Sequence, residues 1–150
     1  MKTKLFILAA AILGAFSSAQ VLAHHSFAAE FDGDNPIRVS GTILKVDWTN
    51  PHAYLHVEVE TETGEYEEWA LEMGSPNGLM RRGWTRNSLP VGTDVTVRGT
   101  RARDGSYKGN VQFIVLTETC ERLFAGTSQR EFDENAASQV NRSEGECVLE

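Results

Sequence analysis

Residues 37–48, with the sequence IRVSGTILKVDW, are the stretch that decides the fold class. They read as one long β-strand. Gly41 interrupts the alternation of side chains at a position that suits a β-bulge or a sharp bend. A long first strand that bends in its middle is typical of a small barrel, because its two halves belong to two different sheets.

Four more strands are expected downstream. In the first of them Leu55, Val57 and Val59 share one face and polar residues the other, which is the alternation of a half-buried strand. A hairpin turn with the Asp-Gly signature, Arg103-Asp104-Gly105-Ser106, separates the last two. The four predicted strands are Tyr54–Thr61, Tyr66–Met73, Val95–Gly99 and Val111–Thr117.

A short helix is expected between the third and fourth strands. Ser75 suits the N-cap and Pro76 the first helical position, so Asn77–Arg82 should be helical and Gly83 should end the helix. Three strands, a helix and two strands is the order of the OB-fold, a five-stranded Greek-key barrel. We therefore predict a mainly β protein with a small OB-like barrel. An open β-meander with a helix is the competing architecture.

The first 23 residues predict a cleaved export signal. Lys2 and Lys4 are positively charged, residues 5–16 are apolar, and Val21 and Ala23 occupy the −3 and −1 positions of a signal-peptidase site. The apolar run is short for a bilayer span, and no second apolar segment follows it. We therefore expect a periplasmic or secreted protein with no stable membrane anchor.

Cleavage after Ala23 leaves 127 of the 150 residues, which suits one domain. We predict an OB-like domain over residues 24–125, in which residues 24–35 form a leader with a turn at 32–36. Phe27 and Phe31 are four residues apart and fit one helical turn that anchors this leader, although an extended leader is equally compatible. Residues 126–150 are polar without periodicity and predict a C-terminal tail.

The charge of the chain excludes two classes of partner. The formal net charge is −7, and loss of Lys2 and Lys4 with the signal makes it −9. Nucleic acids and anionic lipids are bound through basic patches, so neither is an expected partner.

Cys120 and Cys147 are the only cysteines. In an oxidising compartment an even pair indicates a disulfide. Two free thiols that bind a soft metal are the alternative.

Several short motifs occur together and resemble those of the exported bacterial proteins grouped as domain-of-unknown-function family 6152. The resemblance implies an exported small β-domain and no particular activity. It covers residues 24–109, and the region from Cys120 to Glu150 lies outside it. The motifs are His24-His25-Ser26-Phe27, Glu30-Phe31-Asp32, Gly41-Thr42, Asn50-Pro51-His52, Trp69, Glu72, Gly83-Trp84, Gly92-Thr93 and Arg103-Asp104-Gly105-Ser106.

Three histidines are candidate metal ligands. Cleavage after Ala23 would give His24 a free α-amine beside its imidazole, and the amine titrates near neutral pH. His52 follows a proline, which provides a rigid mount, and His25 can replace either imidazole. The α-amine and imidazole of His24 and the imidazole of His52 would together form a T-shaped site of three nitrogen donors, known as a histidine brace. An all-nitrogen site of this kind favours Cu(II). Zinc fits less well, because it needs a fourth ligand such as Glu30 or Asp32.

The histidine brace can form only if the leader, residues 24–35, folds back toward His52. An imidazole of His24 or His25 must come within about 5–6 Å of His52. The competing interpretation is that His24 and His25 are a mobile start to the mature chain and that His52 hydrogen-bonds its own loop. His56 shares a strand face with Tyr54 and is predicted to be a surface residue.

The chain lacks the common motifs of hydrolases, zinc proteases, phosphate loops and thiol oxidoreductases, which favours a non-enzymatic role. One function class is a copper-binding carrier or buffer. The other is a metal-free OB-type binding module for a small ligand, a glycan or a protein partner. A copper oxygenase is a third and less favoured class, because the sequence shows no substrate-binding surface. Arg81, Arg82 and Arg86 form a cluster that either binds an anionic ligand or is a solvated face.

Overall fold

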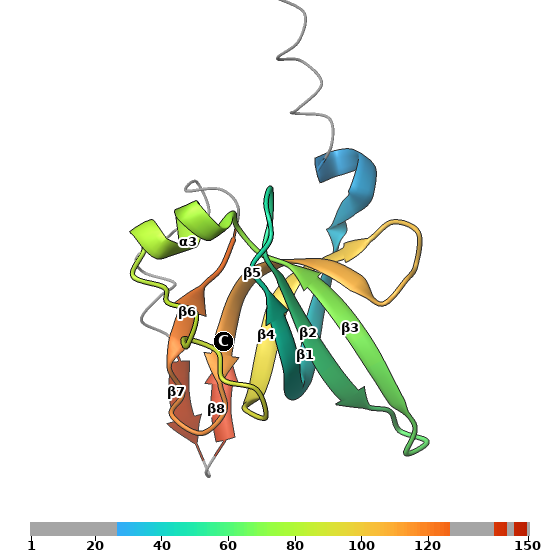
Figure 1. The fold of residues 1–150 in the computed structure, drawn as a ribbon. Coiled ribbons are helices and arrows are strands. Elements are labelled where there is room, and N and C mark those ends of the chain that lie inside the picture. Colours follow the sequence, from blue (N-terminus) through green and yellow to red (C-terminus); the bar gives the residue numbers. More distant parts are fainter. Residues whose placement is uncertain (1–26, 127–139, 144–145, 150) are drawn as a thin grey trace, which may run out of the picture. The chain divides into compact units, whose positions relative to one another are not determined.

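The structure is a computed structural model that describes residues 27–126, 140–143 and 146–149. The chain divides into two compact units, Met1–Glu30 and Phe31–Glu150. Of the first unit, the described part is one helical turn at residues 27–30. The second unit is mainly β, as predicted (Figure 1). In the described part of the chain, no helix combines the length and the apolar character that crossing a membrane would require.

The described residues of the second unit form eight strands and one helix. Six strands form one sheet and the last two form a separate hairpin. The elements are β1 Phe31–Asp47, β2 Tyr54–Glu60, β3 Tyr66–Glu72, α3 Pro76–Arg81, β4 Asp94–Ala102, β5 Lys108–Leu116, β6 Arg122–Phe124, β7 Val140–Ser143 and β8 Glu146–Leu149.

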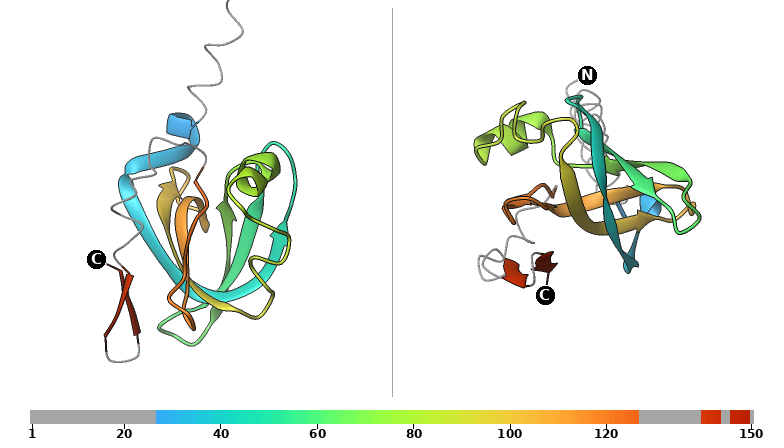
Figure 2. Two further views of the ribbon diagram at one scale, coloured as in Figure 1. Left: turned by 90° about the vertical axis from the view of Figure 1, so that its left-hand side faces the viewer. Right: turned by 90° about the horizontal axis from the view of Figure 1, so that it is seen from below.

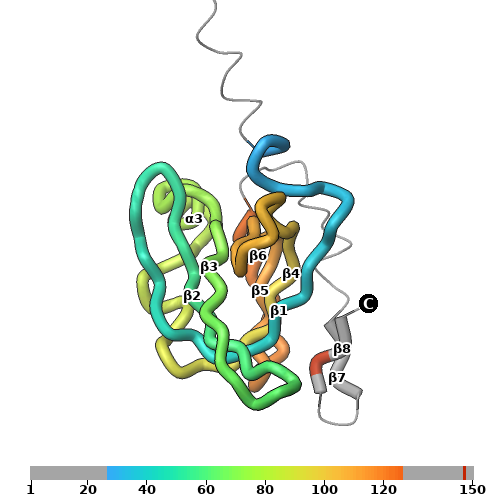
Figure 3. Tube along the Cα trace, turned by 90° about the vertical axis from the view of Figure 1, so that its right-hand side faces the viewer, coloured from blue at the N-terminus to red at the C-terminus, as the bar shows by residue number. Residues whose placement is uncertain are grey.

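The six-stranded sheet has the order β3-β2-β1-β4-β5-β6, in which neighbouring strands are antiparallel. β3 also pairs with β5 in parallel, where Ala70–Glu72 oppose Lys108–Asn110 (Figure 3). With this pairing the strands β1 to β5 form a closed ring, in which β3, β2, β1, β4 and β5 are paired in turn and β5 pairs again with β3. The order is not that of a meander, because β3 and β4, which follow each other in the chain, are not neighbours in the sheet.

β1 curves strongly and changes its partner in the middle (Figure 2). Its first half pairs with β4 and its second half with β2, and Thr42 pairs with both. The register irregularity lies between Ile43 and Lys45, two residues beyond the glycine at which the sequence places a bulge or bend. Gly41 marks a close approach instead: a Cβ built on it would lie 2.1 Å from the backbone oxygen of Glu58.

β1 begins at Phe31 rather than Ile37, so the predicted turn at residues 32–36 is wrong. β4 extends to Ala102, which pairs with Phe31, and Thr100 of β4 pairs with Pro36. Between these two pairs the register is irregular, because residues 32–35 of β1 lie opposite the single residue Arg101 of β4. Phe31 is buried at 3% exposure, whereas Phe27, in the helical turn, is 41% exposed.

The predicted alternation in β2 and β3 is confirmed. Leu55, Val57, Leu71 and Met73 are fully buried, and Val59 packs against the same core from a partly buried position. Strands with one covered face therefore lie where the pattern of the sequence places them.

The short helix is also confirmed. The Ser75 side chain caps α3 by accepting a hydrogen bond of 3.2 Å from the backbone N–H of Gly78, and Pro76 opens the helix. Gly83 follows the C-cap with a φ of 89°, a conformation that favours glycine.

The predicted disulfide between Cys120 and Cys147 is confirmed, with a Cα–Cα distance of 5.4 Å. The prediction of five strands is too low, because β6 extends the sheet and β7 and β8 form a hairpin within the region predicted as a tail. A strand of three residues such as β6 is too short to show an alternation in the sequence.

Replacement of both cysteines by serine is expected to lower the free energy of unfolding by roughly 3–4 kcal/mol, because the bond closes a loop between residues 27 positions apart. Urea unfolding followed by tryptophan fluorescence measures the loss. Reduction of the wild-type chain serves as the control and should give a similar loss. Equal midpoints for the oxidised chain and the double variant would show that the bond adds no stability to the domain.

Candidate functional site

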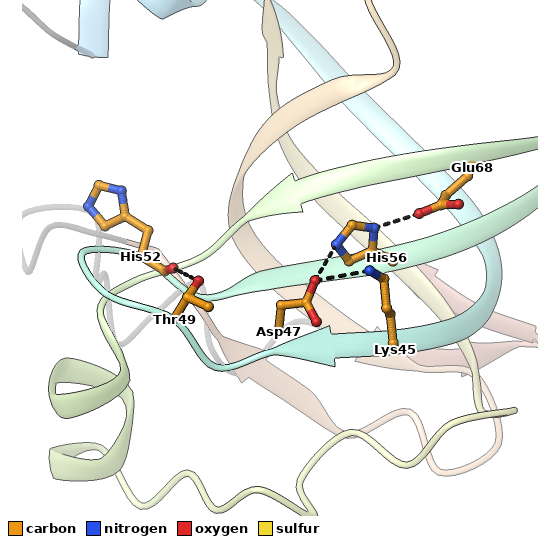
Figure 4. Close-up of polar contacts among 6 residues, drawn as sticks. All are labelled: Lys45, Asp47, Thr49, His52, His56 and Glu68. Atoms are coloured by element: carbon orange, nitrogen blue, oxygen red, sulfur yellow. Dashed lines mark hydrogen bonds and ion pairs between the residues drawn. The ribbon is translucent and has the colours of Figure 1, made fainter.

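His52 lies in the loop between β1 and β2, directly after Pro51. The imidazole Nδ1 is 2.8 Å from Oε1 of Glu72, and the side chain is 37% exposed. The backbone oxygen of His52 accepts a hydrogen bond of 3.0 Å from the Thr49 hydroxyl, which fixes the loop (Figure 4). The side chain therefore contacts the end of β3 rather than its own loop.

Glu72 is one of the buried polar residues of the core, with a side chain only 8% exposed. The Tyr54 hydroxyl donates to its Oε2 at 3.0 Å, and the Asn110 side-chain amide donates to its Oε1 at 3.3 Å. A carboxylate taken out of water is costly unless donors surround it. Donors from β2, from β5 and from the His52 loop meet this need.

The contact between His52 and Glu72 uses Nδ1 of the imidazole and leaves Nε2 available to bind a metal ion. An ionised carboxylate only accepts hydrogen bonds, so Nδ1 carries the proton that faces Glu72, and in the neutral ring the lone pair is on Nε2. Within the described residues no hydrogen-bond partner faces Nε2. A histidine held at one nitrogen by a carboxylate is the usual arrangement around a protein metal ion.

Of the three histidines that are candidate ligands, only His52 lies among the described residues. Across residues 27–126 and the two C-terminal strands, no group of three or more His, Cys, Asp or Glu side chains is placed to hold a metal ion. His24 and His25 lie outside the described residues, as does their predicted approach to His52. Asp32, a candidate fourth ligand for zinc, lies 3.5 Å from Arg103.

His56 is not the exposed surface residue that the strand pattern predicts. Its side chain is 14% exposed, with Nε2 3.1 Å from Asp47 and Nδ1 2.6 Å from Glu68 (Figure 4). Lys45 donates a 3.1 Å hydrogen bond to Asp47; this contact, reinforced by His56, holds the pKa of that carboxyl below its ordinary value. Both ring nitrogens of His56 face carboxylates, so this residue links β1, β2 and β3.

Strand alternation missed the role of Glu72. With Trp69, Leu71 and Met73 inward, the pattern of β3 places Glu72 outward and predicts that it is exposed. Its pairing opposite Tyr54 on one side and Asn110 on the other brings the two donors to it. These pairings join distant parts of the chain, and only the register of the folded sheet reveals them.

A family model described as a family of unknown function (DUF6152) matches residues 13–112. The chain belongs to this family. The matched region contains β1 to β4, α3, most of β5, and both His52 and Glu72, whereas the Cys120–Cys147 disulfide lies outside it. Comparison with curated proteins and with solved structures gives no match.

Proposed function

We propose that the protein is exported, is cleaved after Ala23 and binds a metal ion through His24, His25 and His52. Copper is the metal that this set of donors favours, and the protein acts as a carrier or buffer of the ion in the periplasm or outside the cell. The observation that carries the proposal is the His52–Glu72 pair.

Glu72 supports ligation by His52 in two ways. Its carboxylate selects the tautomer with the proton on Nδ1, and it fixes the orientation of the ring, which leaves Nε2 for an ion. Tyr54 and Asn110 hold the carboxylate in turn, so little rearrangement is needed when an ion arrives. The partial exposure of His52 gives an ion in solution access to the ring.

The mature N-terminus completes the donor set in this proposal. The α-amine and imidazole of His24 add two nitrogen donors, and His25 offers a third. The amine loses its proton near neutral pH, and nitrogen donors in a tetragonal arrangement favour Cu(II) over zinc.

We also propose that strands β1 to β5 form an OB-like barrel. Two observations support it: the circuit of pairings closed by β3 and β5, and the position of α3 between β3 and β4. In such a barrel the His52 loop joins the first two strands.

The experiment compares the chain that begins at His24 with the same chain after acetylation of its α-amine. Intact-mass measurement of the exported protein first establishes the start of the mature chain. Acetylation is expected to weaken Cu(II) binding by about tenfold or more in a competitive titration, because one ligand is lost. Equal affinities, or a mature chain that starts elsewhere, would contradict the proposed N-terminal site.

A further inference from the structure

A cavity of about 720 Å³ is lined by the segment that follows α3 and by strand β6. Its volume falls within the range of small-molecule sites. Arg82, Trp84 and Ser88 line it from one side, and Arg122 and Phe124 from β6. None of these residues belongs to the His52–Glu72 pair.

Two hydrogen bonds join the walls of the cavity. The indole Nε1 of Trp84 donates to the backbone oxygen of Phe124 at 3.1 Å, and Nη1 of Arg82 donates to the backbone oxygen of Gly126 at 2.8 Å. Trp84 is only 6% exposed, so its ring is a fixed part of the wall. The cavity is therefore held in shape by β6 and the segment after the helix.

The cavity carries two guanidinium groups that lie on aromatic rings. The guanidinium carbon of Arg82 is 5.0 Å from the centre of the Phe124 ring, and that of Arg122 is 3.6 Å from the centre of the Phe113 ring. Burial, reinforced by the neighbouring Arg98, lowers the pKa of Arg122. The group is still charged near neutral pH, because the ordinary pKa of arginine is far higher.

Neither guanidinium has a carboxylate partner among the described residues. This is notable in a chain with 21 acidic and 14 basic residues, and Glu121 also lines the cavity without forming such a pair. Arginine has five N–H donors, of which Arg82 uses one for Gly126. Positive charge and spare donors thus face a space that has aromatic and apolar walls.

The cluster predicted from the sequence is divided in the fold. Arg86 lies over the Trp48 ring at 5.9 Å, Arg81 ends α3, and of the three arginines only Arg82 lines the cavity. Arg122, forty residues farther along the chain, provides the second charge.

We propose that this cavity binds a small organic anion in which a carboxylate is attached to an aromatic ring. The planar guanidinium groups match the geometry of a carboxylate and can bind it through paired hydrogen bonds. Trp84, Leu123 and Phe124 offer apolar surface to the ring of the ligand. The site does not depend on the metal-binding proposal.

The test is calorimetric titration of the full processed chain, in the presence of a chelator, with 1-naphthoate and with its neutral analogue 1-naphthamide. We expect saturable binding of naphthoate and at least about tenfold weaker binding of naphthamide, since only the first is charged. This comparison requires no variant. Arg122→Gln and Arg82→Gln should each weaken naphthoate binding about tenfold, whereas Arg86→Gln, outside the cavity, should leave it unchanged.

Three results would overturn the proposal. One is the absence of saturable naphthoate binding, and another is equal affinity for the two probes. The third is naphthoate binding that appears only after Glu131, Asp133 and Glu134 are all changed to glutamine, which would assign the cavity to the acidic segment of the chain itself.

Discussion

Replacement of Gly41 by alanine is expected to lower the free energy of unfolding by at least about 3 kcal/mol, or to prevent folding altogether. The added Cβ would lie 2.1 Å from the backbone oxygen of Glu58 and 3.0 Å from its carbonyl carbon. A backbone atom cannot move aside as the end of a flexible side chain does, so β1 and β2 would have to separate. They would separate next to Thr42, where β1 is paired on both sides.

Gly33→Ala is the matched control, because Gly33 lies in the same strand and an added Cβ there meets nothing within 4 Å. We expect this variant to change the free energy of unfolding by less than about 0.5 kcal/mol. Urea unfolding measures both variants. If Gly41→Ala unfolded at the same urea concentration as Gly33→Ala, the close approach of β1 and β2 at this position would be wrong.

His52→Ala is expected to weaken Cu(II) binding to the processed chain by about 100-fold, which corresponds to roughly 2.7 kcal/mol. The variant removes Nε2 and also leaves Glu72 with one donor fewer. Competitive titration against a chelator of known affinity measures the change.

The matched control is His56→Ala. Both ring nitrogens of His56 already face carboxylates, so its loss should leave the copper affinity unchanged while the link between β1, β2 and β3 is lost. If the two variants weakened copper binding equally, the assignment of His52 as the ligand would fail.

The parts of the fold that depend on local interactions could be predicted from the sequence. The alternation around Leu55 and Val57 and the capping of α3 by Ser75 act within a few residues, so their pattern is visible in the chain. The disulfide could be predicted as well, because the chain has only one pair of cysteines.

The parts that depend on contacts between distant segments could not be predicted. β1 begins early because β4 offers partners as far as Ala102, and β6 is defined by its pairing with β5 rather than by any pattern of its own. The burial of Glu72 likewise arises where β2, β3 and β5 meet. For the candidate site, the sequence identified His52 as a ligand, whereas Glu72 entered only as one of the family motifs and without a role beside His52.

The alternation of residues in β2 predicts correctly on which face of the strand His56 lies, but it predicts a side chain that is more exposed than the structure shows. The residue does face away from the core residues Leu55 and Val57, but Asp47 and Glu68 on the neighbouring strands cover it. A period of two residues determines the face of a strand, whereas the exposure of a side chain also depends on the length and charge of its neighbours on that face.

Electron paramagnetic resonance of the processed chain after addition of one equivalent of Cu(II) tests most directly whether His52 binds copper. We expect an axial Cu(II) spectrum with nitrogen hyperfine splitting, which His52→Ala reduces and His56→Ala leaves intact. A spectrum of free copper, or a nitrogen-coordinated spectrum that His52→Ala does not change, would show that His52 is not a copper ligand.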